Sequence, residues 1–109
     1  MDIRFTGQNL KITTGMKEHI EGKLPKFEKY VPRIVEAHVC LKKEKYFFVA
    51  EITVLAKGLH AFGAGRSKEN IFASMDNAYD RVLKQLKKHC ARKKDHYQKG
   101  GKSTLRAAS

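Results

Sequence analysis

Basic side chains near the C-terminal end of the chain recur at a spacing that could bind a row of anions. They occupy positions i, i+3, i+7 and i+11 of one helical repeat and are Arg81, Lys84, Lys88 and Arg92. The segment 81–102 carries nine cationic side chains and one acid, a formal charge of +8. Like charges one turn apart destabilise a helix, so we expect these cations to have a partner. A polyanion, most simply a row of phosphates, fits the pattern.

Further cations are candidates for the same contact. Two more lie on the C-terminal helix, three lie on the first predicted helix, and two flank the predicted start of the second helix. Acids at 18, 21 and 28 can pair with the first-helix lysines, whereas backbone N–H groups at a helix start favour an anion. The alternative for all of these side chains is a solvated surface. The candidate anion-binding residues are Arg81, Lys84, Lys87, Lys88, Arg92, Lys93, Lys23, Lys26, Lys29, Arg66 and Lys68.

Other side chains that could do chemistry do not assemble a site. The segment 63–67 lacks the third glycine of a dinucleotide fingerprint and the Gly-Lys-Ser/Thr of a P-loop, so its glycines predict a bulge or strand end. His89, Cys90 and His96 match no closed zinc spacing. No nucleophile accompanies the remaining histidines. We therefore predict no catalytic residue, no metal site and no cofactor.

Several aromatic side chains can stack on nucleobases. They are Tyr30, Tyr46, Phe47 and Tyr97. Packing in the core or at a sheet edge is the favoured interpretation for the first three. For Tyr97, which lies among cations, both interpretations stay open.

The first third of the chain predicts a short strand and an interrupted helix. Apolar and polar residues alternate over 3–7, which is typical of a strand with one buried face. Thr13 can cap a helix, and apolar residues then repeat every three or four positions as far as Val31. Pro25 removes a helical hydrogen bond, so the helix should kink or break there.

The middle of the chain predicts three strands, and a long helix follows them. The strands cover 34–42, 46–56 and 59–65, the last weakened by two glycines. Ser67 can cap a helix over 71–92. The residues predicted to face inward from the first of these strands are Val35, Ala37, Val39 and Leu41.

The order strand, helix, three strands, helix predicts an α+β two-layer sandwich. Short turns between adjacent strands favour a mainly antiparallel four-stranded sheet with two helices on one face. We expect one domain over 1–97 and a disordered basic tail, or the start of a linker, over 98–109.

The whole chain has 109 residues and a formal charge of +12, so its partners should be acidic. Cys40 and Cys90 lie on a predicted strand and helix, which makes a disulfide framework improbable. No apolar run approaches the length of a membrane span, and the N-terminus has no leader pattern. We expect a cytoplasmic protein that does not contact a membrane.

Four stretches, in order, resemble the ribosome hibernation-promoting factors and ribosome-associated inhibitors of bacteria and plastids. They are 3–9, 12–13 with 24–30, 49–52, and 71–76 leading to 83–89. The resemblance implies a β-α-β-β-β-α domain similar to double-stranded-RNA-binding folds. It also implies binding in the decoding channel of the small ribosomal subunit, against 16S-type ribosomal RNA, where the domain blocks messenger and transfer RNA under stress or in stationary phase.

The resemblance leaves two forms open. The chain lacks the acidic tail of the inhibitor branch and is more similar to the short factors that assist ribosome pairing, which implies a monomer when free and a second pairing factor. Gly100–Ser103 also resembles the start of a linker to a dimerising domain in the long forms. A general structured-RNA-binding module and a small ribonuclease remain the alternative functions.

Overall fold

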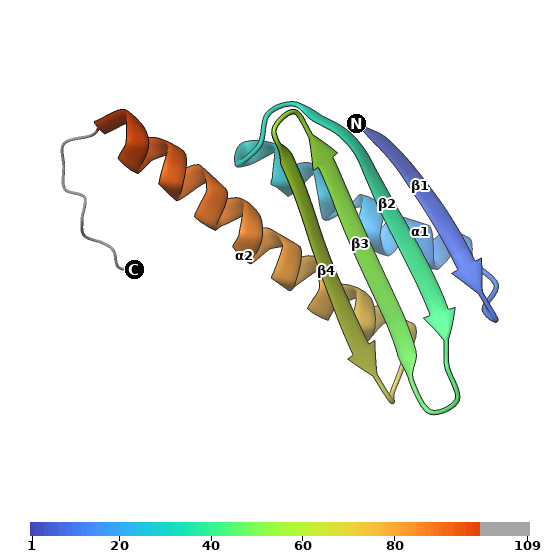
Figure 1. The fold of residues 1–109 in the computed structure, drawn as a ribbon. Coiled ribbons are helices and arrows are strands. Elements are labelled where there is room, and N and C mark those ends of the chain that lie inside the picture. Colours follow the sequence, from blue (N-terminus) through green and yellow to red (C-terminus); the bar gives the residue numbers. More distant parts are fainter. Residues whose placement is uncertain (99–109) are drawn as a thin grey trace.

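The computed structural model describes the backbone of residues 1–98 and the side chains of residues 1–90. The predicted tail over 98–109, apart from its first residue, and the side chains of Arg92, Lys93 and Tyr97 lie outside this range. The elements in chain order are β1 (Asp2–Gln8), α1 (Thr14–Glu21), the 3-10 helix η1 (Leu24–Lys29), β2 (Ile34–Lys43), β3 (Phe48–Ala56), β4 (Leu59–Ser67) and α2 (Ile71–Gln98) (Figure 1).

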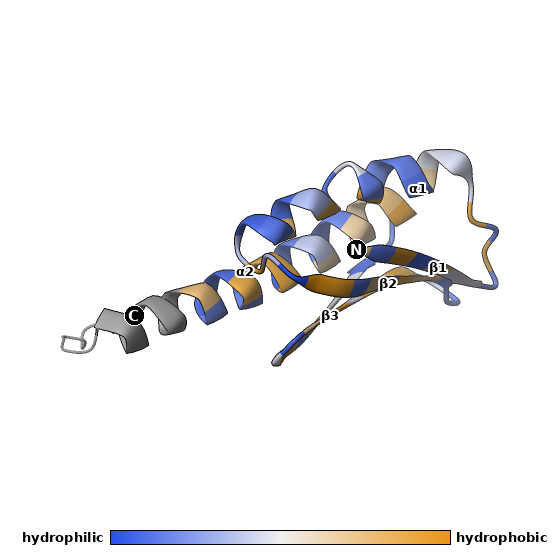
Figure 2. Ribbon diagram, turned by 90° about the horizontal axis from the view of Figure 1, so that it is seen from above, coloured by the Kyte–Doolittle hydropathy of each residue, from blue (hydrophilic) through white to orange (hydrophobic). Residues whose placement is uncertain are grey.

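The four strands form one sheet in the order β1-β2-β3-β4. β1 pairs with β2 in parallel, whereas β2–β3 and β3–β4 are antiparallel. Both helices lie on the same face of the sheet, as Figure 2 shows from above. The predicted α+β two-layer sandwich, with a mainly antiparallel sheet, is confirmed.

The predicted interruption of the first helix is also confirmed. Thr13 caps α1, because its hydroxyl accepts a hydrogen bond from the backbone N–H of Met16 at 3.2 Å. The helix ends at Glu21, and Pro25 then lies at the start of η1, where its missing N–H costs nothing. The apolar repeat continues across the break, since Leu24 and Phe27 are both fully buried.

One inward-facing residue was predicted wrongly. Val35 is 64% exposed, whereas Ile34 and Ala37 are buried. The pairing of β2 with β3 shifts register between Ile34 and Glu36, as at a β-bulge. A bulge adds a residue to one strand and reverses the alternation of its side chains. Beyond it, Ala37, Val39 and Leu41 face inward as predicted.

The sequence predicted that the glycines of β4 mark a bulge or the end of the strand, and this prediction is wrong. β4 pairs with β3 without a register shift from Leu59 to Ser67. A methyl group on Gly63 would lie 2.8 Å from the carbonyl oxygen of Ala78, and one on Gly65 would overlap the backbone of α2. The glycines therefore allow α2 to approach β4 closely.

The cap of α2 also differs from the prediction. The helix begins at Ile71, and the side-chain oxygen of Asn70 accepts a hydrogen bond from the N–H of Ala73 at 2.8 Å. Ser67 instead accepts from the N–H of Glu69 at 3.0 Å in the turn before the helix. Asn and Ser serve equally well as caps, so local sequence does not separate the two choices.

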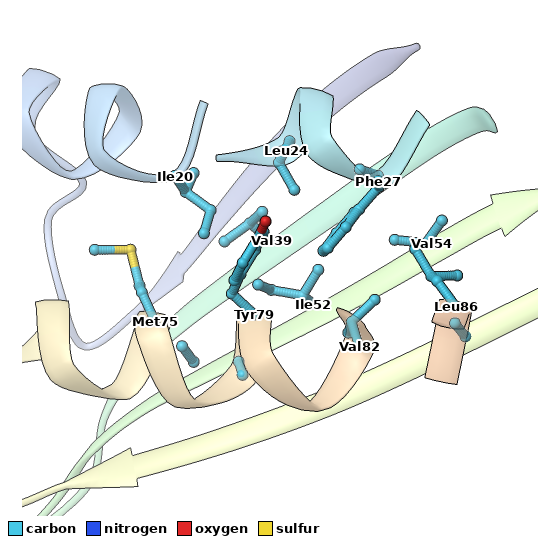
Figure 3. Close-up of a cluster of buried hydrophobic side chains, with 14 of the residues drawn as sticks. Ile20, Leu24, Phe27, Val39, Ile52, Val54, Met75, Tyr79, Val82 and Leu86 are labelled. Atoms are coloured by element: carbon cyan, nitrogen blue, oxygen red, sulfur yellow. The ribbon is translucent and has the colours of Figure 1, made fainter. Parts of the chain in front are cut away.

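The core lies between the sheet and the two helices (Figure 3). The rings of Phe27 and Tyr79 stack with centroids 4.9 Å apart and join η1 to α2. Burying each large apolar side chain stabilises the fold by roughly 1.5–3 kcal/mol. The largest fully buried apolar side chains are Phe27, Ile20, Leu24, Leu41, Ile52, Met75, Leu86, Val39, Val54 and Val82.

Candidate nucleic-acid interface

The outer side of α2 carries exposed cations, while its inner side is buried in the core. Val82 and Leu86 are fully buried and fix the rotation of the helix. The side chains at the opposite positions, Arg81, Lys84, Lys87 and Lys88, are exposed. The structure thus brings together four of the six candidate cations on this helix.

Arg81 has a second role that the sequence did not indicate. Its Nη1 donates a hydrogen bond to the carbonyl oxygen of Ala64 on β4 at 2.6 Å. Asn77 and Gln85, one turn before and after it, also bond to the backbone of β4. β4 is an edge strand, and unpaired edge groups are an aggregation hazard that these side chains reduce. Arg81 therefore keeps only its remaining donors for an anion.

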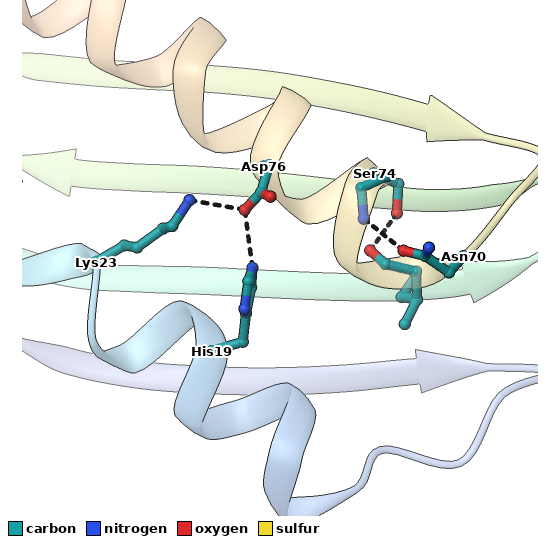
Figure 4. A network of polar contacts seen from close by, with 7 residues as sticks. His19, Lys23, Asn70, Ser74 and Asp76 are labelled. Atoms are coloured by element: carbon teal, nitrogen blue, oxygen red, sulfur yellow. Dashed lines mark hydrogen bonds and ion pairs between the residues drawn. The ribbon is translucent and has the colours of Figure 1, made fainter.

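Lys23 is engaged inside the protein. Its Nζ donates to Oδ1 of Asp76 at 2.7 Å, and it lies 5.2 Å from the ring centroid of Tyr79. His19 Nε2 donates to the same carboxylate oxygen at 2.8 Å, so Asp76 joins α2 to α1 and to Lys23, the residue before η1 (Figure 4). The local pairing of Lys23 with glutamates, suggested by the sequence, is replaced by this long-range pair.

These partners change the pKa of the Asp76 carboxylate. Burial acts to raise the pKa of Asp76, but the hydrogen bonds and charges of Lys23 and His19 outweigh it and lower the pKa below its ordinary value. The carboxylate is therefore ionised at neutral pH. A charged Asp76 neutralises Lys23 and makes that lysine a weaker candidate for phosphate binding.

Lys26 and Lys29 are exposed on η1. Neither makes an ion pair with a residue whose side chain the structure describes. Local pairing with Glu28 or Glu21 is thus not present in the described part of the chain. Both lysines therefore stay available for an anion.

Arg66 lies at the end of β4, and Lys68 lies in the turn between β4 and the start of α2 at Ile71. The guanidinium carbon of Arg66 is 5.1 Å, and Nζ of Lys68 5.8 Å, from the ring centroid of Phe47. Phe47 belongs to the turn between β2 and β3, so the tertiary structure places these cations beside that turn. Tyr46 of the same turn is 69% exposed, and its predicted packing at a core or edge is wrong.

Two more cations, Arg33 and Lys57, come near α2 through the fold alone. They help to line a cavity of about 430 Å³ together with His89. Nζ of Lys87 lies 5.9 Å from the ring centroid of Tyr30, another lining residue, so the cavity adjoins the exposed cations of α2. No local spacing links Arg33, Lys57 and α2, which is why the sequence did not indicate them.

The described residues offer little support for chemistry of other kinds. Among them, no group of three or more His, Cys, Asp or Glu side chains is placed to hold a metal ion. Cys40 and Cys90 are free thiols. Burial, with a contribution from Glu51, raises the pKa of Cys40, so this thiol is protonated and a poor nucleophile at neutral pH. No helix in the described range is long and apolar enough to cross a membrane.

The sheet order, the two helices on one face and the exposed cations define a small basic α+β domain. The family model described as "Sigma 54 modulation protein / S30EA ribosomal protein" matches residues 3–94. The chain therefore belongs to this family, and the resemblance drawn from the four sequence stretches is confirmed.

Individual relatives agree with this assignment. The chain is 33% identical over 98 residues to the ribosome hibernation promoting factor of Escherichia coli (strain K12), covering 88% of this chain and 100% of that protein. It is 28% identical over 89 residues to the ribosome hibernation promoting factor of Pseudomonas putida (strain KT2440), covering 82% of this chain and 86% of that protein.

Solved structures share the fold. The N-terminal domain of Thermus thermophilus Protein Y superposes with a TM-score of 0.74 at 29% identity, covering 82% of this chain and 99% of that one. A ribosomal subunit interface protein from Coxiella burnetii gives a TM-score of 0.77 at 23% identity, covering 84% and 99%. At the lower identity the likeness shows the fold alone.

Proposed function

We propose that this chain is a ribosome hibernation factor that binds the small ribosomal subunit in its decoding channel, against ribosomal RNA. There it excludes messenger and transfer RNA and keeps the ribosome inactive under stress or in stationary phase. Family membership and the names of the relatives support a role in ribosome hibernation. The exposed cations of α2 support a contact with RNA.

The observation that carries the RNA contact is the division of α2 into two sides. Val82 and Leu86 anchor one side in the core, so the other side presents Lys84 and Lys88 outward on a rigid support. Cations fixed in this way neutralise phosphates without reading bases, which suits recognition of folded RNA by its shape.

The proposed action is occupancy without catalysis. Binding of phosphates releases counterions, so affinity should depend strongly on salt. If about six phosphates are contacted, the logarithm of the affinity should fall with the logarithm of the salt concentration at a slope of roughly −4 to −5. A ribosome bound in this way regains activity when the factor dissociates, because no covalent bond has changed.

A sedimentation experiment tests the proposal. Ribosomes and separated subunits are centrifuged with the protein at low and at physiological salt, and each fraction is assayed for the protein. We expect it to travel with the small subunit and to be displaced by excess messenger and transfer RNA. Absence from the small subunit even at low salt would overturn the proposal.

The same samples address the alternative functions. Free duplex RNA that removes the protein from the small subunit when the two are present at equal molarity would favour a general structured-RNA module. Cleavage of the added RNA would favour a ribonuclease. Intact RNA, inhibited translation and a preference for the small subunit would together support the hibernation factor.

A further inference from the structure

The turn between β2 and β3 forms an aromatic and cationic cluster at the end of the sheet opposite the C-terminal half of α2 (Figure 1). We call it the turn cluster. Its members are Lys43, Lys45, Tyr46, Phe47, Arg66 and Lys68.

The turn holds Tyr46 at its tip. Glu44 and Phe47 exchange both backbone hydrogen bonds, at 2.8 and 3.2 Å, so Lys45 and Tyr46 occupy the two central positions of a tight hairpin. Gly, Asn and Asp are favoured in two-residue hairpin turns whose central residues have a positive φ, but neither Lys45 nor Tyr46 has a positive φ. The backbone of this turn therefore accepts most residue types, and it does not by itself require an aromatic side chain at position 46.

Tyr46 is exposed, although the sequence favoured its packing in the core or at a sheet edge. It is 69% exposed, more than any other large hydrophobic residue in the described part of the chain. Phe47 beside it is half-buried, between the hairpin and the cations of β4. Phe47 thus packs against the cations of the cluster, whereas the ring of Tyr46 remains accessible to a ligand.

One cation lies beside this exposed ring, and others lie on the neighbouring aromatic rings. Nζ of Lys45 lies 5.8 Å from the centroid of Tyr46, and Nζ of Lys43 lies 4.7 Å from that of Phe48. Arg66 and Lys68 lie beside Phe47. Lys42 is paired with Glu51, and the segments 43–47 and 66–69 beside it carry four cations and two acids. An exposed aromatic ring among excess positive charge is the combination with which proteins bind unpaired nucleotides: the ring stacks on a base and the cations contact adjacent phosphates.

We infer that the turn cluster binds an unpaired nucleotide of RNA, with the base stacked on Tyr46 and the flanking phosphates on Lys45 and Arg66. This inference rests on the proposed function in taking RNA as the partner. It adds a contact of a different kind, because α2 is suited to the backbone of folded RNA and the turn cluster to a base outside a helix. Lys68 and Lys43 extend the positive surface on either side.

The test measures binding of fluorescent oligoadenylate of about 12 nucleotides, and of a blunt RNA duplex of the same length, by anisotropy. We expect Tyr46→Ala to weaken single-strand binding about tenfold, since one stacked base is lost, and to leave duplex binding unchanged. Tyr46→Phe is the matched control. It keeps the ring and should bind both RNAs like the parent protein.

Three outcomes would overturn the inference. They are a parent protein that does not bind the single strand, a Tyr46→Ala variant that binds it with full affinity, and equal losses for strand and duplex. If the turn cluster binds a protein and not RNA, Tyr46→Ala should keep its full affinity for the single strand. Because Tyr46 is exposed, circular dichroism should show an unchanged fold.

Failure of the inference and failure of the proposed function can be distinguished. If the parent protein sediments with small subunits but Tyr46→Ala loses no single-strand affinity, only the turn cluster is refuted. If the parent protein does not sediment with small subunits, the proposed function fails whatever the oligonucleotides show.

Discussion

The two helical segments that cover the sheet carry the same number of cations in residues 14–30 and 71–90 but present them differently. The segment 14–30, which includes α1 and η1, has four lysines and three glutamates, whereas residues 71–90 of α2 have four cations and two acids, both of which come before Arg81. Lys23 of the first segment is further neutralised by Asp76. The comparison shows that the number of cations on a surface predicts little until their internal partners are known.

The two segments are also held differently. α2 lies directly on β4 because Gly63 and Gly65 leave space for its backbone, and side chains of α2 bond to the edge of that strand. α1 is joined to α2 through the carboxylate of Asp76. The helix with the more rigid support is thus α2, and its exposed cations make no ion pair with an acid in the described part of the chain.

The largest expected effect comes from reversing charge on α2. Lys84→Glu combined with Lys88→Glu should weaken binding to small subunits roughly 100-fold or more at physiological salt and flatten the salt dependence, because phosphate contacts become repulsive. Filter binding at several salt concentrations measures both quantities.

The matched control for that variant is Lys11→Glu combined with Lys17→Glu. Both lysines are exposed and make the same change in net charge, but they lie before and within α1. An equal loss of affinity in the control would mean that overall charge, and not the surface of α2, determines binding.

A smaller effect should follow from disturbing the support of α2. Gly65→Ala places a methyl group against the backbone of the helix and should lower the free energy of unfolding by about 2 kcal/mol. Urea denaturation measures it. Gly15→Ala, whose new methyl group would meet only the Thr13 hydroxyl at 3.9 Å, should be neutral or slightly stabilising. Equal stabilities for both variants would contradict close packing on β4.

The link between the helical segments should contribute less. Asp76→Asn removes a partly exposed ion pair and should lower the free energy of unfolding by about 1 kcal/mol or less at pH 7. Because the pKa of Asp76 is lowered in the folded protein, its contribution is present above the ordinary value of 3.8 and is lost as the pH falls through the folded pKa. Urea denaturation of both proteins at pH 7 and at about pH 3 should therefore show a difference that shrinks in acid. A difference that grows in acid would refute this role.

The smallest effect is expected from the first segment. Lys26→Glu combined with Lys29→Glu should weaken small-subunit binding only a few-fold, since Glu18, Glu21 and Glu28 already reduce the local positive potential. The same filter-binding assay applies. A loss of small-subunit affinity as large as that of the α2 variant would contradict the proposed difference between the two surfaces.

The prediction of the fold from sequence worked where neighbouring residues decide the structure. The apolar repeats of α1, η1 and α2, the cap at Thr13 and the alternation within β3 all predicted elements that the structure contains. It was wrong where two elements meet. Val35 and the glycines of β4 were misread because a bulge and a close helix contact depend on the partner strand and helix.

The candidate site likewise has features that a single segment predicts and features that depend on contacts between segments. Exposure of Lys84, Lys87 and Lys88 followed from the position of the buried stripe on their own helix. The pairing of Lys23 with Asp76 joins residues 53 positions apart. The approach of Arg66 to Phe47 and of Arg33 and Lys57 to α2 likewise depends on strand pairing and packing.

The sequence by itself thus determined the element order, the fold class and the positive outer side of α2, because each follows from periodicity within a single segment. Only the tertiary structure decided which cations have internal partners and which aromatic rings are exposed. Those properties arise from contacts between segments distant in the chain, and a side chain meets its partner there only after the layers have packed.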